Sequence, residues 1–302
     1  MQFLVGLLII AVTVFGGFMF HGGQMSVIWQ PVEIVIICGA GAGALVIGNP
    51  KHVLTELWLQ VKHSLGKRRD GNEFHRQLLL LMYELLQTAA GGLKALDAHV
   101  EAPQESDMFK RYPMVLADPK LLAFIVDNFR LMAMGKISAH ELEGVLDHEI
   151  EAIHEELNQP QKSLQKIAEA MPGFGIVAAV LGIVMTMAAI GEGAGSAEVA
   201  AKVGAAMVGT FIGIFMCYCL LDPMCNMMKQ LVAEEQSMLE IVKVVIVTHV
   251  AGKPPLLAID AGRRLVQLNT KPSFAKLEGW INALSGGGEP EPAQSRRATD
   301  RA

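Results

Sequence analysis

The stretch MPGFGIVAAVLGIVMTMAAI, residues 171–190, decides the fold. It has the length of a helix that crosses the ~30 Å hydrocarbon core of a bilayer, and Thr186 is its only polar side chain. Three further runs share this character: residues 3–20, residues 34–47 with flanks to 49, and residues 203–221. The chain is therefore predicted to be an all-α integral membrane protein with four transmembrane helices.

The composition supports the membrane class. Of the 302 residues, 52% are hydrophobic and 18% are charged, which is too apolar for an ordinary soluble domain. The net charge is -5 and no basic stripe with interleaved aromatic residues is present, so we expect no nucleic-acid partner. The four cysteines lie in or beside apolar runs without C-x-x-C spacing, so neither a disulfide framework nor a metal site is predicted.

Basic residues set the predicted orientation, because Lys and Arg near span ends are retained on the cytoplasmic side. All 25 Lys and Arg residues except Lys202 lie in two blocks, 51–171 and 223–302. The connectors between spans one and two and between spans three and four are short and carry almost no basic charge. Both termini and the middle block are therefore predicted to be cytoplasmic.

The spans divide the chain into five predicted segments. In order these are 1–50 with spans one and two, 51–170 as a large helical cytoplasmic domain between spans two and three, 171–222 with spans three and four, 223–284 as a cytoplasmic C-terminal helical region, and 285–302, whose composition is that of a disordered tail.

The middle block contains several helix signals. Ser138 lies three residues before Glu141, the spacing of a capping box, and Pro160 is predicted to end the helix that begins there. Apolar periodicity predicts further helices over 74–87 and 117–136, and a helix that extends span four beyond Pro223. The buried face of the capped helix is predicted to hold Leu142, Val145 and Leu146.

Small residues recur along three spans at the four-residue spacing that lets helix backbones approach closely in lipid. They are Ala205, Gly209 and Gly213 in span four, Gly175 with Ala179 and Ala178 with Gly182 in span three, and the GAGAGA run 39–44 in span two. Two interpretations remain open: tight packing within one four-helix bundle, or assembly of several subunits.

The four runs carry no charged residue at mid-depth. Glu33 and Asp222 lie at span ends, where interfacial anchoring is the preferred interpretation. Ion-conducting proteins usually keep an ionisable group inside the membrane. If these spans line an ion path, the ion-carrying carboxylate must therefore come from another chain.

At this point the sequence resembles a known family, the flagellar motor stator subunits of the MotA and PomA type. The resemblance covers nearly the whole chain up to about residue 284. It rests on the order of spans and on stretches such as QPVEIVIICGAGAGALVIGNP, MPGFGIVAAVLGIV, AAMVGTFIGIF, YPMVLADPKLLAFIVDNFRLM and PPLLAIDAGRRL.

The resemblance implies a bacterial inner-membrane protein that forms a homo-oligomer, a pentamer in this family. The ring would surround a dimer of a single-span MotB-type partner, whose membrane aspartate binds the ion. Its cytoplasmic part would push a rotor switch-complex protein. Ion flow would thus be converted into rotation, with no enzymatic activity, no cofactor and no bound metal.

Several residues match positions to which the family gives a role. Thr210 matches a channel-facing threonine, and Thr186 and Ala179 are also assigned to the ion path; the local alternative for a threonine is a hydroxyl bonded to its own helix. Ala179 stands where sodium-driven members carry threonine, so the resemblance favours protons over sodium. Pro172 and Pro223 match prolines that couple ion flow to movement, although a proline near a helix start is ordinarily only geometric.

The rotor contact in this family uses an arginine followed eight residues later by a glutamate, and a further glutamate before span three. Here Ala89 stands at the arginine position, Asp97 at the first acidic position and Glu149 at the second. The basic partner is thus missing from its usual place. Candidates to replace it are Lys94, Lys110 and Arg111, although each is also expected simply as a solvated charge.

Two other functions are weighed. An energy-coupling subunit of the ExbB and TolQ type also borrows a partner's carboxylate, but such proteins have three spans and begin outside. A membrane-tethered enzyme would need a convergent catalytic set, and none is found: His148 and His154 are six residues apart, whereas H-E-x-x-H zinc sites need four.

Overall fold

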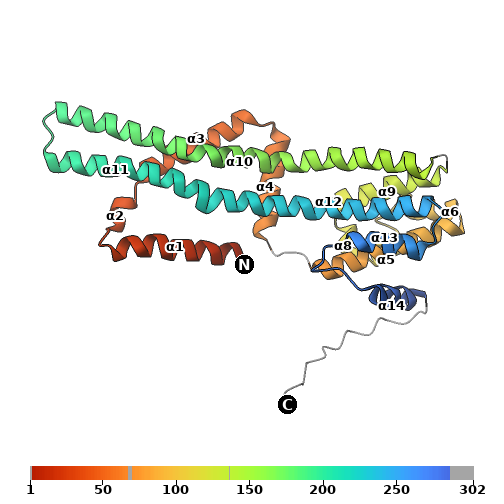
Figure 1. The fold of residues 1–302 in the computed structure, drawn as a ribbon. Helices are drawn as coiled ribbons and strands as arrows, with labels where there is room; N and C mark the ends of the chain where they lie inside the picture. Colours follow the sequence, from red (N-terminus) through yellow and green to blue (C-terminus); the bar gives the residue numbers. More distant parts are fainter. Residues whose placement is uncertain (1, 67–69, 136, 286–302) are drawn as a thin grey trace, which may run out of the picture. The chain divides into compact units, whose positions relative to one another are not determined.

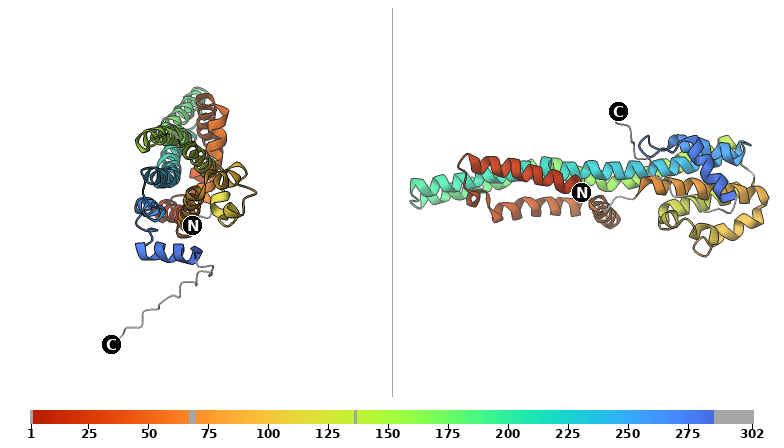
Figure 2. Two further views of the ribbon diagram at one scale, coloured as in Figure 1. Left: turned by 90° about the vertical axis from the view of Figure 1, so that its right-hand side faces the viewer. Right: turned by 90° about the horizontal axis from the view of Figure 1, so that it is seen from below.

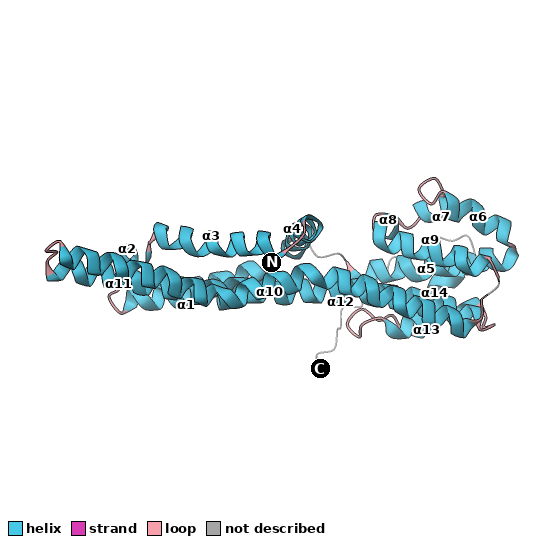
Figure 3. Ribbon diagram, turned by 90° about the horizontal axis from the view of Figure 1, so that it is seen from above, coloured by secondary structure: helices cyan, strands magenta, loops and turns pink. Residues whose placement is uncertain are grey.

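The computed structural model describes residues 2–66, 70–135 and 137–285. Within these residues the chain forms helices joined by short loops, and no strand occurs there (Figure 3). By compactness the chain divides into two units, Met1–Arg68 with Ala152–Glu234, and Arg69–Glu151 with Glu235–Ala302. The predicted segment 51–170 is thus shared between two compact units; its boundaries as a cytoplasmic segment remain a prediction. The residues 286–302 of the predicted tail lie outside the described residues.

The first unit holds the membrane helices. In chain order they are α1 (Gln2–Phe20), α2 (Met25–Ile28), α3 (Pro31–Gly48), α4 (Lys51–Leu65), the second part of α10 (Ala139–Gly191), α11 (Ser196–Phe215), the π-helix η1 (Met216–Leu221) and the first part of α12 (Asp222–Val250). Four helical segments among the described residues are long and apolar enough to cross a membrane, which agrees with the four predicted spans. The third and fourth spans are parts of longer helices.

The helices α10 and α11 run antiparallel and lie side by side in the first unit (Figure 1). A Cβ added to Gly175 would lie 2.8 Å from the carbonyl oxygen of Gly209, and one added to Gly213 would lie 2.6 Å from that of Met171. Glycine is required at both positions because the facing backbones leave no room for a side chain. Of the two interpretations left open, packing within one chain is the one that these contacts support.

Two other helices pack on this pair. The helix α1 runs beside α11 (Figure 2), and the ring of its Phe15 lies 6.5 Å from the ring of Phe211 and 5.5 Å from that of Phe215, measured between centroids. The helix α3 packs on α11 through Ile37, which belongs to one apolar cluster with Met171, Ala178, Val208, Ile212 and Cys217. At its C-terminal end, Asn49 accepts a hydrogen bond from the Ser163 hydroxyl at 2.5 Å.

The prediction that Pro160 ends a helix is wrong, because α10 continues through it to Gly191. Proline removes one backbone hydrogen bond and pushes against the carbonyl one turn earlier, at a cost of about 3 kcal/mol. In this turn Nε2 of Gln60 on α4 donates to the carbonyl oxygen of Leu157 at 2.9 Å. Leu157 and Leu164 are buried on either side of the proline, so side-chain packing carries the helix across it.

Pro223, near the start of α12, follows a turn whose hydrogen bonds are not those of an α-helix. The helix predicted beyond Pro223 is confirmed, but the chain reaches it through the π-helical turn η1. A proline at 223 cannot donate a hydrogen bond to the carbonyl of Cys219. A π turn, with its i to i+5 bonds, accommodates one extra residue in just such a position.

The second unit is a helical domain. It contains α5 (Gly71–Gly91), α6 (Leu93–Glu101), α7 (Asp107–Lys110), α8 (Pro113–Leu116), α9 (Pro119–Ala133), α13 (Pro255–Leu265) and α14 (Phe274–Ser285), with the remaining parts of α10 and α12. The predicted helices over 74–87 and 117–136 correspond to α5 and α9. Its core is formed by large side chains that are fully buried, among them Phe74, Leu78, Leu85, Phe109, Ile125, Phe129, Ile241 and Ile259.

The start of α10 lies in this unit and follows the predicted capping box. The Ser138 hydroxyl oxygen accepts from the Glu141 backbone N–H at 3.3 Å, and the Glu141 carboxylate accepts from the Ser138 backbone N–H at 3.0 Å. Leu142 and Leu146 are buried as predicted, whereas Val145 is 48% exposed, so its assignment to the buried face is wrong. The buried stripe continues from Leu146 to Ile150 with a four-residue step, and Val145 falls beside it.

Candidate functional site

The membrane unit contains the residues predicted to line an ion path, and they lie along one seam between α10 and α11. Ala179 and Thr210 are partly buried. Thr186 is fully buried, and its hydroxyl donates to the carbonyl oxygen of Gly182 at 2.8 Å. This is the local bond that was the alternative for a threonine, so the hydroxyl of Thr186 is engaged within its own helix.

Glu33 was predicted to be an interfacial anchor, but its position is that of a core residue. It is only 9% exposed and lies on the same face of α3 as Ile37 and Gly41. Its Oε2 is buried without a hydrogen-bond partner. A Cβ added to Gly209 would lie 3.2 Å from this oxygen and 3.3 Å from Cβ of Ala178. The carboxyl group therefore faces the α10–α11 seam next to Thr210 and not the membrane surface.

The two prolines assigned to coupling differ in position: Pro172 lies inside a helix, whereas Pro223 lies at a helix start, the position that a purely geometric role would suggest. Pro172 is an interior residue of α10, and Pro223 follows the π-helical turn at the beginning of α12. Each removes a backbone donor at the end of an apolar stretch, and such positions are where long helices bend. Their role in coupling remains a prediction.

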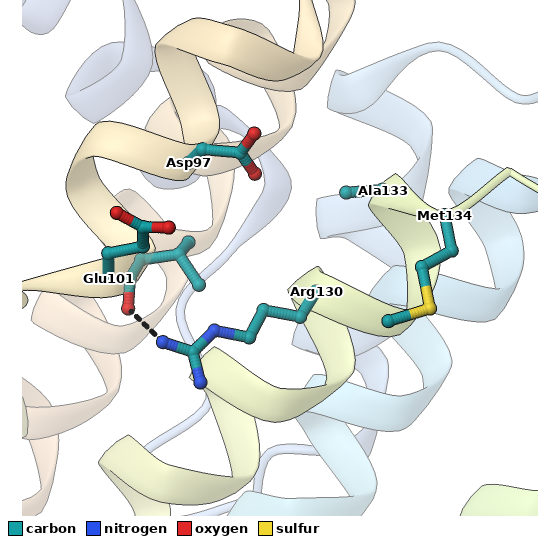
Figure 4. Close-up of a pocket in the computed structure, with 6 residues that line it drawn as sticks. Asp97, Glu101, Arg130, Ala133 and Met134 are labelled. Carbon is teal, nitrogen blue, oxygen red and sulfur yellow. Dashed lines mark hydrogen bonds between the residues drawn. The ribbon is translucent and has the colours of Figure 1, made fainter.

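A second candidate site lies in the helical domain. A surface cavity of about 340 Å³ is lined by α6 and α9, which contact each other. Asp97 and Glu101 of α6 line it on one side, and Arg130, Ala133 and Met134, at the C-terminal end of α9, line it on the other (Figure 4). The Arg130 guanidinium donates to the carbonyl oxygen of Val100 at 3.3 Å, which holds it against α6.

This arrangement gives Asp97 a basic neighbour that the local sequence did not offer. Arg130 is 33 residues from Asp97 (130 − 97) in the chain, and only the packing of α6 on α9 places both at one cavity. Its side chain remains 46% exposed and lies 3.7 Å from Asp127. The cavity therefore presents one cation and two carboxylates to solvent.

Two of the three basic candidates named from the sequence, Lys110 and Arg111, do not line this cavity. Arg111 forms an ion pair with Glu84 at 2.6 Å, and Lys110 lies 3.7 Å from Asp107. The side chain of Lys94 lies outside the described residues. Burial raises the pKa of Glu84, and the charge of Arg111 works against this rise. Arg111 is thus already engaged in balancing a half-buried carboxylate.

Glu149 is not among the residues that line the cavity. One of its oxygens accepts a hydrogen bond from Nδ2 of the buried Asn128 at 3.3 Å, so the side chain helps to fix α10 against α9. Sequence reasoning placed Glu33 at a span end instead of in the core and did not single out Arg130. Their positions follow from contacts between helices, and neither belongs to a short motif that could have marked it.

The chain is similar to known proteins over nearly its whole length. Residues 4–92 match the model "Motility protein A N-terminal", and residues 120–241 match the MotA/TolQ/ExbB proton channel family. The chain is 52% identical to Chemotaxis protein LafT of Vibrio parahaemolyticus, over 95% of this chain and 100% of that protein. It is 35% identical to Motility protein A of Salmonella typhimurium, over 94% of this chain and 96% of that protein.

Solved structures agree on the fold. The chain matched in "Structure of C. jejuni MotAB" gives a TM-score of 0.69 at 16% identity, and the match covers 90% of this chain and 98% of that chain. The flagellar MotAB stator complex from Bacillus subtilis gives 0.67 at 21% identity, with 91% and 97% covered. With its four candidate membrane helices and its similarity to motility proteins over nearly the whole chain, the chain belongs to the motility protein A family.

Proposed function

We propose that this chain is the stator subunit of a bacterial flagellar motor and that it forms, with a MotB-type partner, a proton channel that drives rotation. The observation that carries the proposal is the similarity to motility proteins over at least 94% of the chain, which includes both the membrane unit and the helical domain. The chain acts without chemistry on a substrate. Its termini and its helical domain lie in the cytoplasm, as the distribution of basic residues supports.

Protons are the proposed coupling ion. A hard cation such as sodium needs several oxygen ligands. At the seam, Ala179 offers a methyl group, and the Thr186 hydroxyl already bonds the Gly182 carbonyl. Moving one elementary charge through the membrane releases about 2.3 kcal/mol per 100 mV of potential. Protonation of the partner's aspartate inside the subunit ring uses this energy to change the arrangement of the ring.

The rotor contact is proposed at the cavity of Asp97, Glu101 and Arg130. In this interpretation Arg130 supplies the basic charge that is missing at Ala89. A rotor surface that carries charges of both signs would meet complementary charges here, and such complementarity sets orientation and specificity more than affinity.

An experiment that tests the function is deletion of the gene and complementation in the organism of origin. Deleted cells should assemble flagella that do not rotate, and the wild-type gene should restore swimming in sodium-free medium. If complemented cells swim only with sodium, the proton assignment is wrong. If deleted cells lacking any second stator set swim normally, the stator assignment is wrong.

The rotor contact is tested by charge reversal. Arg130→Glu should reduce torque, and a compensating charge reversal on the rotor should restore it. Lys110→Glu, which reverses a charge outside the cavity, serves as the matched control and should swim nearly normally. Equal torque loss in both variants would refute the assignment of Arg130.

An ExbB or TolQ-type subunit is not favoured. Residues 4–92 match the N-terminal region of motility protein A, which contains the first two spans.

A further inference from the structure

The membrane unit carries a titratable group that the borrowed-carboxylate mechanism does not use. Glu33 lies in the first turn of α3, and α2 lies immediately before that helix. It faces Ala178 and Gly209. Apolar residues of α10 continue beyond Ala178 in both directions, from Phe174 on one side to Ile190 on the other. The carboxyl group thus lies within the apolar zone and not at its edge.

The surroundings of Glu33 hold no compensating charge among the described residues. On α11 the nearest charged side chain is Lys202, seven residues (209 − 202) from Gly209, and it is paired with Glu198 at 3.0 Å. On α10 the nearest is Glu169, nine residues (178 − 169) from Ala178. The helix α2 carries none, and Oε2 of Glu33 has no hydrogen-bond partner.

A carboxylate in such a place is costly, and intramembrane acids that persist are functional sites as a rule. A neutral carboxylic acid, formed when the group holds a proton, would not carry this cost. Gly209 is what admits it, because a methyl group there would meet both the Glu33 oxygen and the Ala178 side chain. The carboxyl group lies against Gly209, whose neighbour in the chain is Thr210, a residue predicted to line the ion path.

We propose that Glu33 is a second proton-binding site of the ion path, supplied by this chain itself, in addition to the aspartate of the partner. The site takes a proton and not a metal cation: one carboxyl group against Ala178 and Gly209 offers too few oxygens for a hard cation. The proton binds and leaves at the unpartnered Oε2, and no covalent step is involved. The proposal rests on the proposed function, because it places the site in a stator's ion path.

The direct test is labelling with dicyclohexylcarbodiimide, an apolar reagent that attacks protonated carboxyl groups in membranes. Wild-type complex, co-expressed with its partner, is labelled in membranes over a pH series and the modified residue is identified by peptide mass spectrometry. Glu33 should be labelled, and labelling should fall as the pH rises. The exposed Glu198 is the internal reference. Absence of label at Glu33 at every pH, or suppression of labelling by sodium at constant pH, would overturn the proposal.

The functional test compares Glu33→Gln, which keeps the shape but cannot release a proton, with Glu33→Asp, which keeps the acid. We expect swimming speed to fall at least fivefold in Glu33→Gln, and Glu33→Asp to recover part of it. The matched control Glu198→Gln should swim as the wild type does. Equal complex assembly in all variants is verified by co-purification with the partner.

Failure of this proposal can be told apart from failure of the proposed function. If the wild-type pair supports rotation and Glu33→Gln swims at full speed, Glu33 is not on the ion path, while the stator function stands. If the wild-type pair does not support rotation, the stator function fails, and the labelling experiment still decides whether Glu33 binds a proton.

Discussion

At the scale of single residues, the α10–α11 seam depends on glycines that are not interchangeable. Gly213 faces the backbone of Met171 and Gly175, whereas Gly204 on the same helix has no atom within 4 Å of an added Cβ. A side chain at Gly213 would force the two backbones apart, since the atoms it meets belong to the main chain and cannot rotate away.

Gly213→Ala is therefore expected to destabilise the protein by about 1–3 kcal/mol through overpacking. Gly204→Ala is the matched control and should be neutral or slightly stabilising, because alanine is the better helix former by about 1 kcal/mol. Thermal unfolding in detergent, followed by circular dichroism, measures both. Equal midpoints for the two variants would show that the seam tolerates a wider spacing than the structure has.

A second residue-scale prediction concerns Asp260 in the helical domain. Burial by itself raises the pKa of its carboxyl group, but hydrogen bonds from Arg263 and Arg264, at 2.7 and 2.9 Å, outweigh this and leave the pKa below its usual range. A lowered pKa means that the carboxylate stabilises the fold at neutral pH and that this contribution disappears as the pH falls through the lowered value.

Asp260→Asn should thus cost about 3 kcal/mol at neutral pH, because it leaves the poorly exposed Arg263 without its charged partner. The difference from the wild type should shrink when the pH is lowered below the usual range of aspartate. Unfolding of the wild type and the variant over a pH series measures this. The exposed Asp107 provides the control, and Asp107→Asn should leave the midpoint unchanged at each pH.

At the scale of elements, two prolines in α10 invite opposite expectations. Pro160 lies inside α10, and Nε2 of Gln60 donates a hydrogen bond to the carbonyl oxygen of the nearby Leu157. Pro172 stands where the apolar span begins, and family resemblance assigns it to coupling.

Pro160→Ala restores a backbone donor and should stabilise the protein by about 1–2 kcal/mol, less than the full cost of a helix proline because some packing is lost. Swimming should persist. Pro172→Ala should leave the complex assembled but reduce swimming severely. Thermal melts and swimming speed of both variants, in cells with equal stator levels, test the pair. Normal swimming of Pro172→Ala would remove this residue from the coupling mechanism.

The sequence predicts helices whose determinants are local, and it does not predict features that depend on contacts between distant residues. The spans were predictable because lipid demands long apolar helices, and the capping box at Ser138 was predictable because both its partners are local. The continuation of α10 past Pro160 was not, because it depends on packing by residues far away in the chain. The burial of Glu33 and the position of Arg130 were missed for the same reason: α3 contacts α11, and α6 contacts α9, only in the fold.

At the scale of the whole molecule, the membrane helices leave much of their apolar surface uncovered. No more than 33% of any of the four apolar windows is buried inside the chain, and none of the first window is. The exposed apolar residues of α10 include Val177, Val180, Val184 and Met185. Lipid or other polypeptides must cover these faces.

The isolated chain is accordingly expected to be less stable than the chain co-expressed with its partner. Native mass spectrometry in detergent should find a pentamer of this chain around a dimer of the partner, and its unfolding midpoint should exceed that of the chain alone. An unrelated single-span protein with the same tag is the control. A stable monomer with an unchanged midpoint in the presence of the partner would contradict the expected assembly.

The π-helical turn η1 between α11 and α12 has a consequence for evolution. Each residue of an α-helix turns the chain by about 100°, so the extra residue sets which faces of the two flanking helices are aligned. A relative that has lost one residue between Phe215 and Asp222 would keep an unbroken helix but would turn everything beyond the deletion onto another face. In alignments of stator subunits, a single-residue gap at this turn would therefore mark a change of helix register and not a trimmed loop.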